Sequence, residues 1–344
     1  MINLKNRSIA LKNYIKGMPE ASDFDFLEKE LPTLKDNQVL LKTIYISLDP
    51  YMRGLMSGHK SYRDPAEIGV PIPAGTIGQV LDSKSDSFKK GDFALGNGGW
   101  QTHWCEQENK LRKIDSNLAP LTYYLGVLGM PGHTAYSGIV GLSELKPGET
   151  LIVSAATGAV GSIVGQIAKI KGAKVFGIAG SKEKCKYAIE DLGFDDCFNH
   201  KENIKEDLKK YCAEGIDINF ENVGGEIFWD IFKHMNFHGR IILCGFISQY
   251  NQINKPSNTS DKSLNLLSSL VIKRLKINGL LVYDWKHNYS QFQEEVIGWL
   301  KQGRIKYKVD VVNGFENTIK EFQGLLRGKN FGKLIIRVDE DPTL

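Results

Sequence analysis

A short glycine-spaced segment, AATGAVGSIVG at residues 155–165, constrains the fold more than any other part of the chain. The continuous apolar run TLIVSAA leads into it, and the helical stretch AVGSIVGQIAKIKG overlaps and follows it. A second apolar run, AKVFGIAG, comes next at residues 173–180. A buried strand, a glycine loop, a helix and another buried strand form the unit of a parallel sheet that helices cover on both faces. The sequence therefore predicts an α/β domain with a doubly wound parallel sheet.

The glycines of this loop indicate a dinucleotide site. Backbone that passes close to a pyrophosphate needs small residues, and Gly158 and Gly161 supply them. The helix that follows would point its N-terminal N–H groups and its partial positive charge at the phosphates. Glycines that only permit tight packing between helix and strand are the alternative. The strand–loop–helix–strand context favours the dinucleotide.

The end of the second apolar run indicates which dinucleotide binds. NAD-selective sites place Asp or Glu there, about 20 residues after the glycine loop, to hold the ribose 2′-hydroxyl. This chain has Gly180 and Ser181 instead, followed by Lys182 and Lys184. An ammonium attracts a 2′-phosphate that a carboxylate would repel, so we predict NADPH. A solvated helix start is the alternative for these lysines, and Glu183 between them weakens the argument slightly.

The rest of the chain predicts a second domain. The run VLLKTIYISL is β-branched and aromatic, and the runs after it are short and broken by glycine. Near the C-terminal end, residues 333–338 return to a β pattern after one helical stretch. We predict an all-β domain from residues 1–128 and 306–344, and an α/β domain from residues 129–305. The polar segment 251–263 predicts a loop.

Composition excludes several classes of protein. The chain has 44 Lys and Arg against 40 Asp and Glu, and these basic residues form no dense run. A nucleic-acid partner is not expected, because such proteins gather basic residues on one face. No window approaches the ~20 apolar residues of a membrane span. Lysine and arginine interrupt the apolar stretches of residues 1–20, unlike those of a signal peptide.

Cysteine usage favours a reducing, cytoplasmic location. The cysteines are few, odd in number and far apart: Cys105, Cys185, Cys197, Cys212 and Cys244. This pattern is typical of free thiols. No CxxC or HExxH pair occurs, so we expect no zinc site.

Longer motifs accompany the glycine loop. They are SLDPYMRG, GMPGHTAYSG, GIAGSKEKC, FENVGGEIF, LCGFISQYN and GKNFGKLIIRV. With these motifs the chain resembles, over nearly its whole length, the zinc-independent medium-chain dehydrogenase/reductases. It is most similar to the group containing prostaglandin/leukotriene B4 reductases, plant alkenal double-bond reductases and bacterial NADPH-dependent curcumin reductase.

The resemblance implies a GroES-like β domain around an inserted Rossmann-type domain, with NADPH in the cleft between them. It also implies a homodimer joined through the Rossmann sheets, for which KINGLLVYDW is a candidate edge element. Carried over position by position, the resemblance adds these cofactor-binding residues to Gly158 and Gly161 of the loop: Met130, Thr134, Ala159, Val160, Lys184, Asn222, Cys244, Phe246, Ser248 and Asn330.

One position departs from the pattern of the prostaglandin reductases. They carry a tyrosine next to the adenosine phosphate, where this chain has His200. His200 could donate to the phosphate, with a charge that depends on pH. It could equally be a simple surface histidine, and the sequence leaves both interpretations open.

A metal mechanism is not expected. Zinc alcohol dehydrogenases share this architecture, but they need Cys and His ligands to polarise an alcohol. The segment SLDPYMRG lacks both residue types. His103 and Cys105 lie two apart but lack an adjacent third ligand, so we interpret them as packing residues.

Reduction of an activated C=C bond requires no Lewis acid. Hydride attack on the β-carbon of an enone moves negative charge to the carbonyl oxygen, where a hydrogen-bond donor must meet it. The resemblance implies that Tyr250 stands beside the nicotinamide, and a phenol with a pKa near 10 stays protonated at pH 7. A tyrosine that only shapes the pocket is the alternative. NADPH:quinone reduction and non-catalytic NADPH binding are the competing functions.

Aromatic residues would complete the substrate pocket. We assign Tyr51 and Tyr283 to it, with Trp285 as a possible further wall. An ordinary barrel-edge aromatic is the alternative for Tyr51, and core packing or a subunit contact for the other two. We interpret Arg53 as pairing with Asp49, four residues earlier.

Overall fold

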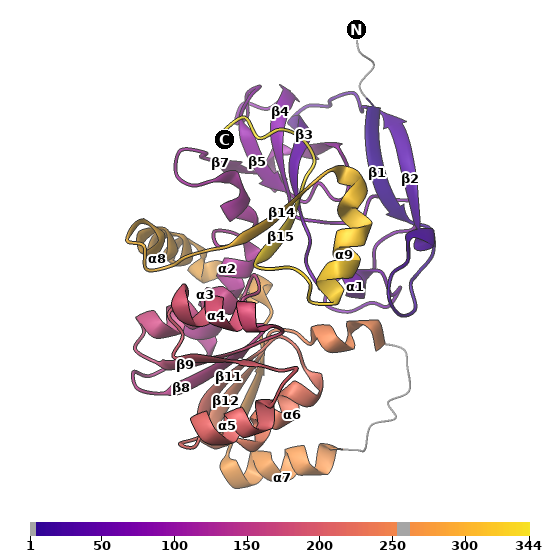
Figure 1. The fold of residues 1–344 in the computed structure, drawn as a ribbon. Coiled ribbons are helices and arrows are strands. Elements are labelled where there is room, and N and C mark those ends of the chain that lie inside the picture. Colours follow the sequence, from indigo (N-terminus) through magenta and orange to yellow (C-terminus); the bar gives the residue numbers. More distant parts are fainter. Residues whose placement is uncertain (1–4, 253–261) are drawn as a thin grey trace. The chain divides into compact units, whose positions relative to one another are not determined.

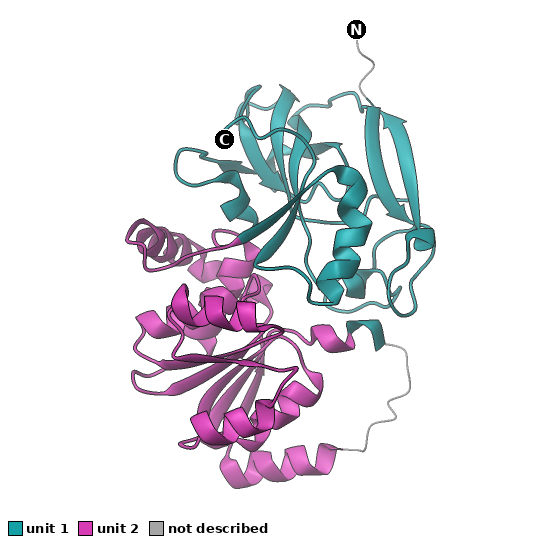
Figure 2. Ribbon diagram, in the orientation of Figure 1, with its two compact units in different colours: residues 1–125, 250–253, 309–344 teal, residues 126–249, 254–308 magenta. Residues whose placement is uncertain are grey.

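The computed structural model describes residues 5–252 and 262–344. The chain forms two compact units, shown in Figure 2: unit 1, from residues 1–125, 250–253 and 309–344, and unit 2, from residues 126–249 and 254–308. Residues 253–261 of the predicted loop lie outside the described residues. The domain boundaries given above stay a prediction.

Unit 2 is built on a parallel sheet (Figure 1). Among the described residues its strands are β8 (Thr150–Ser154), β9 (Lys174–Ala179), β10 (Asp196–Asn199), β11 (Ile216–Glu221), β12 (Met235–Leu243) and β13 (Lys276–Gly279). They lie in the order β10-β9-β8-β11-β12-β13. Counted from β8 along the chain, this is the order 3-2-1-4-5-6 of dinucleotide-binding folds. The predicted Rossmann-type doubly wound sheet is confirmed.

Helical segments complete unit 2. They are α2 (Met130–Tyr136), α3 (Gly161–Ile170), α4 (Lys182–Glu190), α5 (Ile204–Tyr211), α6 (Gly225–Lys233), α7 (Ser263–Lys273) and α8 (Tyr289–Lys301), with the π-helix η4 (Ser137–Leu142) and the 3₁₀ segment η6 (Val282–Asn288). All five residues of β8 are buried, as a strand covered on both faces requires. Gly165 of α3 allows close packing, because a Cβ there would lie 2.0 Å from Cζ of Phe194.

Unit 1 is built mainly from strands. They are β1 (Lys5–Leu11), β2 (Phe24–Glu30), β3 (Gln38–Ser47), β4 (Thr76–Ser83), β5 (Phe93–Gly96), β6 (His103–Gln107), β7 (Arg112–Ile114), β14 (Val309–Asn313) and β15 (Lys333–Arg337). The helices are α1 (Met52–Leu55) and α9 (Thr318–Leu326), with the short 3₁₀ segments η1 (Ala21–Asp23), η2 (Glu108–Lys110), η3 (Leu121–Leu125) and η7 (Phe315–Asn317). β15 pairs antiparallel with β3, so the C-terminal strand joins the N-terminal sheet, as predicted.

One aromatic cluster unites the two ends of the chain in unit 1. Trp100 is fully buried. Its ring centroid lies 6.0 Å from that of Phe24 on β2 and 5.4 Å from that of Phe322 on α9. The N-terminal and C-terminal segments therefore share a single hydrophobic core.

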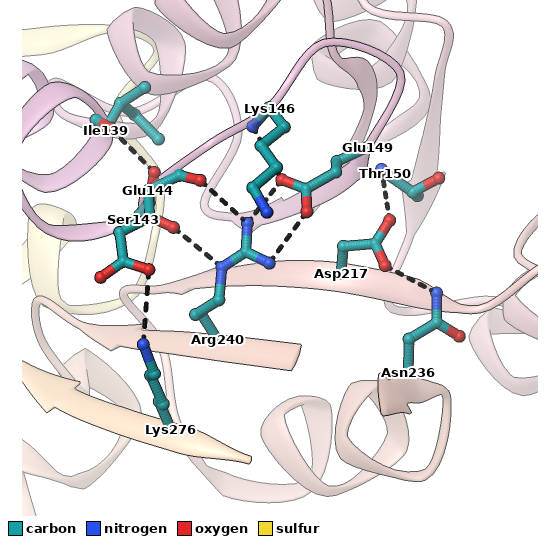
Figure 3. Close-up of polar contacts among 10 residues, drawn as sticks. All are labelled: Ile139, Ser143, Glu144, Lys146, Glu149, Thr150, Asp217, Asn236, Arg240 and Lys276. Atoms are coloured by element: carbon teal, nitrogen blue, oxygen red, sulfur yellow. Dashed lines mark hydrogen bonds and ion pairs between the residues drawn. The ribbon is translucent and has the colours of Figure 1, made fainter. Parts of the chain in front are cut away.

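A largely buried ion pair ties β12 to the loop before β8 in unit 2 (Figure 3). Arg240 Nη1 donates to Oε1 of Glu149 at 2.9 Å, and Arg240 Nε donates to the carbonyl of Ser143 at 2.8 Å. The backbone N–H of Lys146 also donates to Glu149. Burial raises the pKa of the Glu149 carboxyl, but the bonds from Arg240 and Lys146 outweigh it, and its pKa lies below the ordinary value.

This ion pair makes stability depend on pH. Because the pKa of Glu149 is lower in the folded state, the pair stabilises the fold above the unfolded pKa of about 4.3, and the effect is lost as pH falls through the folded pKa. We expect Glu149→Gln to lower the free energy of unfolding by about 1.5–3 kcal/mol at pH 7, and the difference from wild type to shrink in acid. Urea unfolding of both proteins at several pH values between 7 and 3 measures this. A difference that does not change with pH would show that the carboxylate charge is not its source.

Candidate functional site

Most of the predicted cofactor-binding residues follow the carboxyl ends of the parallel strands in unit 2. The β8 end carries Gly158, Ala159, Val160 and Gly161, the β9 end Lys184, the β10 end His200, the β11 end Asn222, and the β12 end Cys244, Phe246 and Ser248. Carboxyl ends of parallel strands meet at one edge of a sheet. The connections reverse between β8 and β11, and ligands of such sheets bind outside that point.

The glycine loop is as tight as its sequence predicts. Gly161 begins α3, and a Cβ there would lie 2.3 Å from the carbonyl oxygen of Ala155. A Cβ at Gly158 would lie 3.1 Å from the same oxygen. Ser162 Oγ donates to the carbonyl of Gly158 at 2.8 Å and closes the turn. The loop therefore brings bare backbone and a helix N-terminus, a favourable place for phosphate, to the edge of the sheet.

A buried carboxylate organises the two loops beside the reversal point. Glu221, at the end of β11, is 1% exposed. Its Oε1 accepts from Ser154 Oγ at 2.7 Å and from the N–H groups of Val223 and Gly224 at 2.7 and 2.8 Å. Sequence analysis missed Glu221. One feature of the sequence could have indicated it: Glu221 is an acidic residue at the end of an apolar strand, in the motif FENVGG.

The loops after β11 and β12 hold each other in place. The Asn222 side chain donates from Nδ2 to the carbonyl of Ser154 at 2.8 Å. Ser248 Oγ donates to the carbonyl of Val223 at 2.6 Å. Phe246 is half-exposed. It packs closely on Gly224, because a Cβ added at Gly224 would lie 2.9 Å from Cβ of Phe246. Burial raises the pKa of the Cys244 thiol to about 12, so this cysteine stays neutral.

The end of β9 carries the residues that the sequence predicts for a 2′-phosphate site. Ser181 caps α4 by accepting at Oγ from the backbone N–H of Lys184 at 3.2 Å. His200 is partly buried, and its Nε2 lies 3.3 Å from where a Cβ of Gly180 would be. Burial lowers the pKa of His200, and the charges of Lys201 and Lys184 lower it further. His200 therefore stands beside Gly180 as a neutral ring at pH 7, not as a fully exposed surface residue.

Three predicted residues of unit 2 come from α2 and η6 and not from these loops. Thr134, on α2, donates from Oγ1 to the carbonyl of Met130 at 2.8 Å. Met130 begins the same helix and is 37% exposed. Tyr283, on η6, is exposed, whereas Trp285 packs so closely on Gly141 that a Cβ there would lie 2.2 Å from the Trp285 ring. The Trp285 ring therefore packs against η4.

The remaining predicted residues belong to unit 1, where the expected pair of Arg53 with Asp49 is wrong. Asp49 pairs with Lys333, whose Nζ lies 2.8 Å from Asp49 Oδ1 and which is 1% exposed. Burial lowers the pKa of Lys333, and Asp49 counteracts this. The pair joins the start of β15 to the segment that carries Tyr51. Asn330 precedes β15 and donates from Nδ2 to the carbonyl of Gly332 at 2.8 Å.

Arg53 instead secures the segment that carries Tyr250. Its Nη2 donates to the carbonyls of Ile15 and Gly17, and its Nε donates to Asn251 Oδ1 at 3.0 Å. Asn251 and Tyr250 both lie on the 3₁₀ segment η5 (Ile247–Gln252). Sequence spacing favoured the near carboxylate, but the chain turns Arg53 inward, where it is 2% exposed and binds carbonyls.

Within the described residues, no group of three or more His, Cys, Asp and Glu side chains could hold a metal ion. Cys105 is on β6, and His103 on the same strand hydrogen-bonds through Nδ1 with Thr102 Oγ1 at 3.1 Å. No described helix has the length and apolarity that a membrane crossing requires. Metal independence of the reaction stays a prediction.

Two family models match the chain, the N-terminal domain of oxidoreductase at residues 7–114 and zinc-binding dehydrogenase at residues 159–302. The chain is 42% identical to the NADPH-dependent curcumin reductase of Escherichia coli (strain K12), over 98% of each sequence. It belongs to the medium-chain dehydrogenase/reductases. This family membership confirms what the motifs indicated.

Two further proteins similar to this chain are informative. The 2-alkenal reductase (NADP(+)-dependent) of Nicotiana tabacum is 40% identical, over 98% of this chain and 99% of the relative. The crystal structure of CurA in complex with NADPH from Vibrio vulnificus is 43% identical and superposes with a TM-score of 0.93, covering 97% and 100% of the two chains.

The residues of the sheet edge in unit 2 fit a dinucleotide. At Gly161 a side chain would collide with backbone, at Gly158 it would make a tight contact, and α3 begins at Gly161. The end of β9 offers Gly180 and Ser181 in place of a carboxylate, with Lys184 in the first turn of α4. This donor set suits a pyrophosphate and a 2′-phosphate.

The cofactor preference of this reductase can be measured. NADPH should bind more tightly than NADH, because β9 ends in Gly180 and Ser181 without a carboxylate and Lys184 follows in the first turn of α4. Lys184→Ala should weaken NADPH binding by about 10–150-fold, the loss of one charge-assisted contact, and leave NADH binding nearly unchanged. Fluorescence titration of both proteins with both cofactors gives the four dissociation constants. Equal affinity of the wild-type protein for the two cofactors would contradict the assignment.

Proposed function

We propose that this chain is an NADPH-dependent, metal-independent reductase of the C=C bond of α,β-unsaturated ketones and aldehydes. The observation that carries this proposal is whole-length identity of 40–42% to reductases named for curcumin and for 2-alkenals. The sheet edge of unit 2 supports it, because its loops and charges suit NADPH. Bound NADPH supplies a hydride to the β-carbon of the substrate.

Residues of the chain bind the cofactor, position its loops and line the substrate pocket. The loop after β8 holds the pyrophosphate through its backbone, and Lys184 holds the 2′-phosphate. Glu221 keeps the loops after β8 and β11 in one arrangement through its bonds to Ser154, Val223 and Gly224. Tyr51 and Tyr283 supply apolar surface for the enone, in keeping with the aromatic lining of small-molecule sites.

Tyr250 serves the carbonyl end of the substrate. Its hydroxyl donates to the carbonyl oxygen as negative charge gathers there, and a proton then reaches the α-carbon from the hydroxyl, from water or from the cofactor ribose. Arg53 supports this role, because it holds Asn251, the next residue, by a partly buried hydrogen bond.

The proposal includes a homodimer in the cytoplasm. Within the described residues β13 is an edge strand of the sheet, and edge strands readily pair with another chain. The nearby helix α7 exposes Leu264, Leu267 and Val271, an apolar row that a second copy could cover. All five cysteines are free thiols, in keeping with a reducing compartment. Sedimentation of the 38.5 kDa chain distinguishes a dimer from a monomer.

A substrate panel tests the proposed function. Loss of NADPH absorbance is followed with a 2-alkenal, with a curcuminoid, with a quinone and with no acceptor, before and after dialysis against a strong chelator. We expect turnover of the first two, saturated products, and no effect of the chelator. Turnover of the quinone alone would establish quinone reduction, and binding without turnover would establish a non-catalytic protein.

Replacement of one hydroxyl tests Tyr250. Loss of a donor aimed at a developing oxyanion costs about 10²–10³ in rate, and water or ribose can shrink the loss toward about tenfold. Tyr250→Phe should therefore lower kcat at saturating NADPH and leave NADPH affinity unchanged, since the ring remains. Gln252→Ala, on the same 3₁₀ segment, is the matched control. Unchanged kcat in the Phe variant, with hydride transfer shown to be rate-limiting, would make Tyr250 a wall of the pocket.

A further inference from the structure

Two cysteines share the wall of a surface cavity in unit 2. The cavity has a volume of about 380 Å³ and is lined by residues of α4, β10 and α5. Cys185 contributes from α4 and Cys197 from β10. Each residue is only 7% exposed, so access to the thiols is through this cavity. Neither cysteine has a part in the proposed reduction of the enone.

The fold places the two thiols in direct contact. Cys197 donates a hydrogen bond to the sulfur of Cys185. Space for this pair comes from Gly177 on the neighbouring strand β9, because a Cβ there would lie 2.9 Å from Sγ of Cys197. A side chain at position 177 would displace the thiol from its place under α4.

The contact makes the two thiols chemically unequal. The hydrogen bond from Cys197 lowers the pKa of Cys185 against the opposing effect of burial. The same bond, together with burial, raises the pKa of Cys197. A thiolate is the nucleophile in cysteine oxidation, and a neighbouring thiol resolves the product. Cys212, which follows α5, is buried and does not line the cavity, and burial raises its pKa to about 12.

We propose that Cys185 and Cys197 are a reversible redox site that a small peroxide converts to a disulfide. The thiolate of Cys185 attacks one peroxide oxygen, the O–O bond breaks, and Cys185 becomes a sulfenic acid while the other oxygen leaves as water. The sulfur of Cys197 then displaces the sulfenic hydroxyl, which leaves as a second water. The two thiols lose two hydrogens and two electrons, and the peroxide gains them.

The disulfide weakens NADPH binding, a consequence that rests on the proposed function. A disulfide holds its sulfurs about 2.05 Å apart, closer than hydrogen-bonded thiols, so α4 must move toward β10. Lys184, the residue assigned to the 2′-phosphate, precedes Cys185 in the first turn of α4. Coupled sites typically change each other's affinity by about 5-fold or more. NADPH must by the same linkage disfavour the disulfide.

Mass spectrometry of the full chain tests the site. Wild type, Cys185→Ser, Cys197→Ser and the control Cys212→Ser are treated with hydrogen peroxide, with dimedone to trap sulfenic acid. Trypsin separates the two cysteines, because it cleaves after Lys184, Lys186 and Lys201. We expect a dithiothreitol-sensitive cross-linked peptide in wild type and Cys212→Ser, none in Cys185→Ser, and a dimedone adduct on Cys185 in Cys197→Ser. Absence of the cross-link in wild type would overturn the proposal.

NADPH titration separates this proposal from the proposed function. The oxidised wild type should bind NADPH at least about 5-fold more weakly than the reduced protein, and dithiothreitol should restore the affinity. Peroxide-treated Cys185→Ser should bind as before treatment. An intact cross-link with unchanged NADPH affinity would overturn the coupling. A reduced wild type that binds no NADPH would defeat the proposed function and leave the disulfide result to stand alone.

Discussion

A single buried carboxylate sets the arrangement of the sheet edge in unit 2. Glu221 accepts hydrogen bonds from the end of β8, through Ser154, and from the first residues after β11. These two parallel strands are neighbours at the point where the crossover connections change from one side of the sheet to the other. A charged group with so little exposure must be fully hydrogen-bonded. The loops that supply these donors therefore have little conformational freedom. The hydrogen bonds to Glu221 thus fix the positions of the glycine loop after β8 and of Asn222 after β11.

Unit 1 is held together in a similar way by buried cations, where unit 2 has a buried carboxylate. Lys333 is buried and is compensated by Asp49 and by the carbonyl of Leu48. Arg53 is buried with carbonyls and one amide as its acceptors. Removing one partner of a buried charge is far more costly than losing an exposed pair. These two cations connect segments that are remote in sequence, because Asp49 and Lys333 come from opposite ends of the chain.

Periodicity and local chemistry predicted the fold class and the phosphate loop. A run of buried residues, closely spaced glycines and a helix start are all within a dozen residues, so no distant contact is needed to interpret them. The same holds for Gly180, Ser181 and Lys184 at the end of β9. His200 also belongs to this edge, but its burial beside Gly180 depends on the pairing of β10 with β9. The sequence therefore could not predict whether His200 is exposed or partly buried.

The spacing of residues in the sequence could not predict contacts between residues that are distant along the chain. The sequence placed Asp49 four residues from Arg53, a separation that favours an ion pair on a helix, but α1 is only four residues long and Asp49 precedes it. Lys333 reaches Asp49 because β15 pairs with β3. The thiols of Cys185 and Cys197 meet because α4 packs over β10 and because Gly177 leaves room. Short-range patterns in the sequence determined the sheet, its glycine loop and its preference for phosphate. Tertiary structure alone decided the partners of the buried charges and thiols, because burial and strand pairing bring together groups that no local pattern connects.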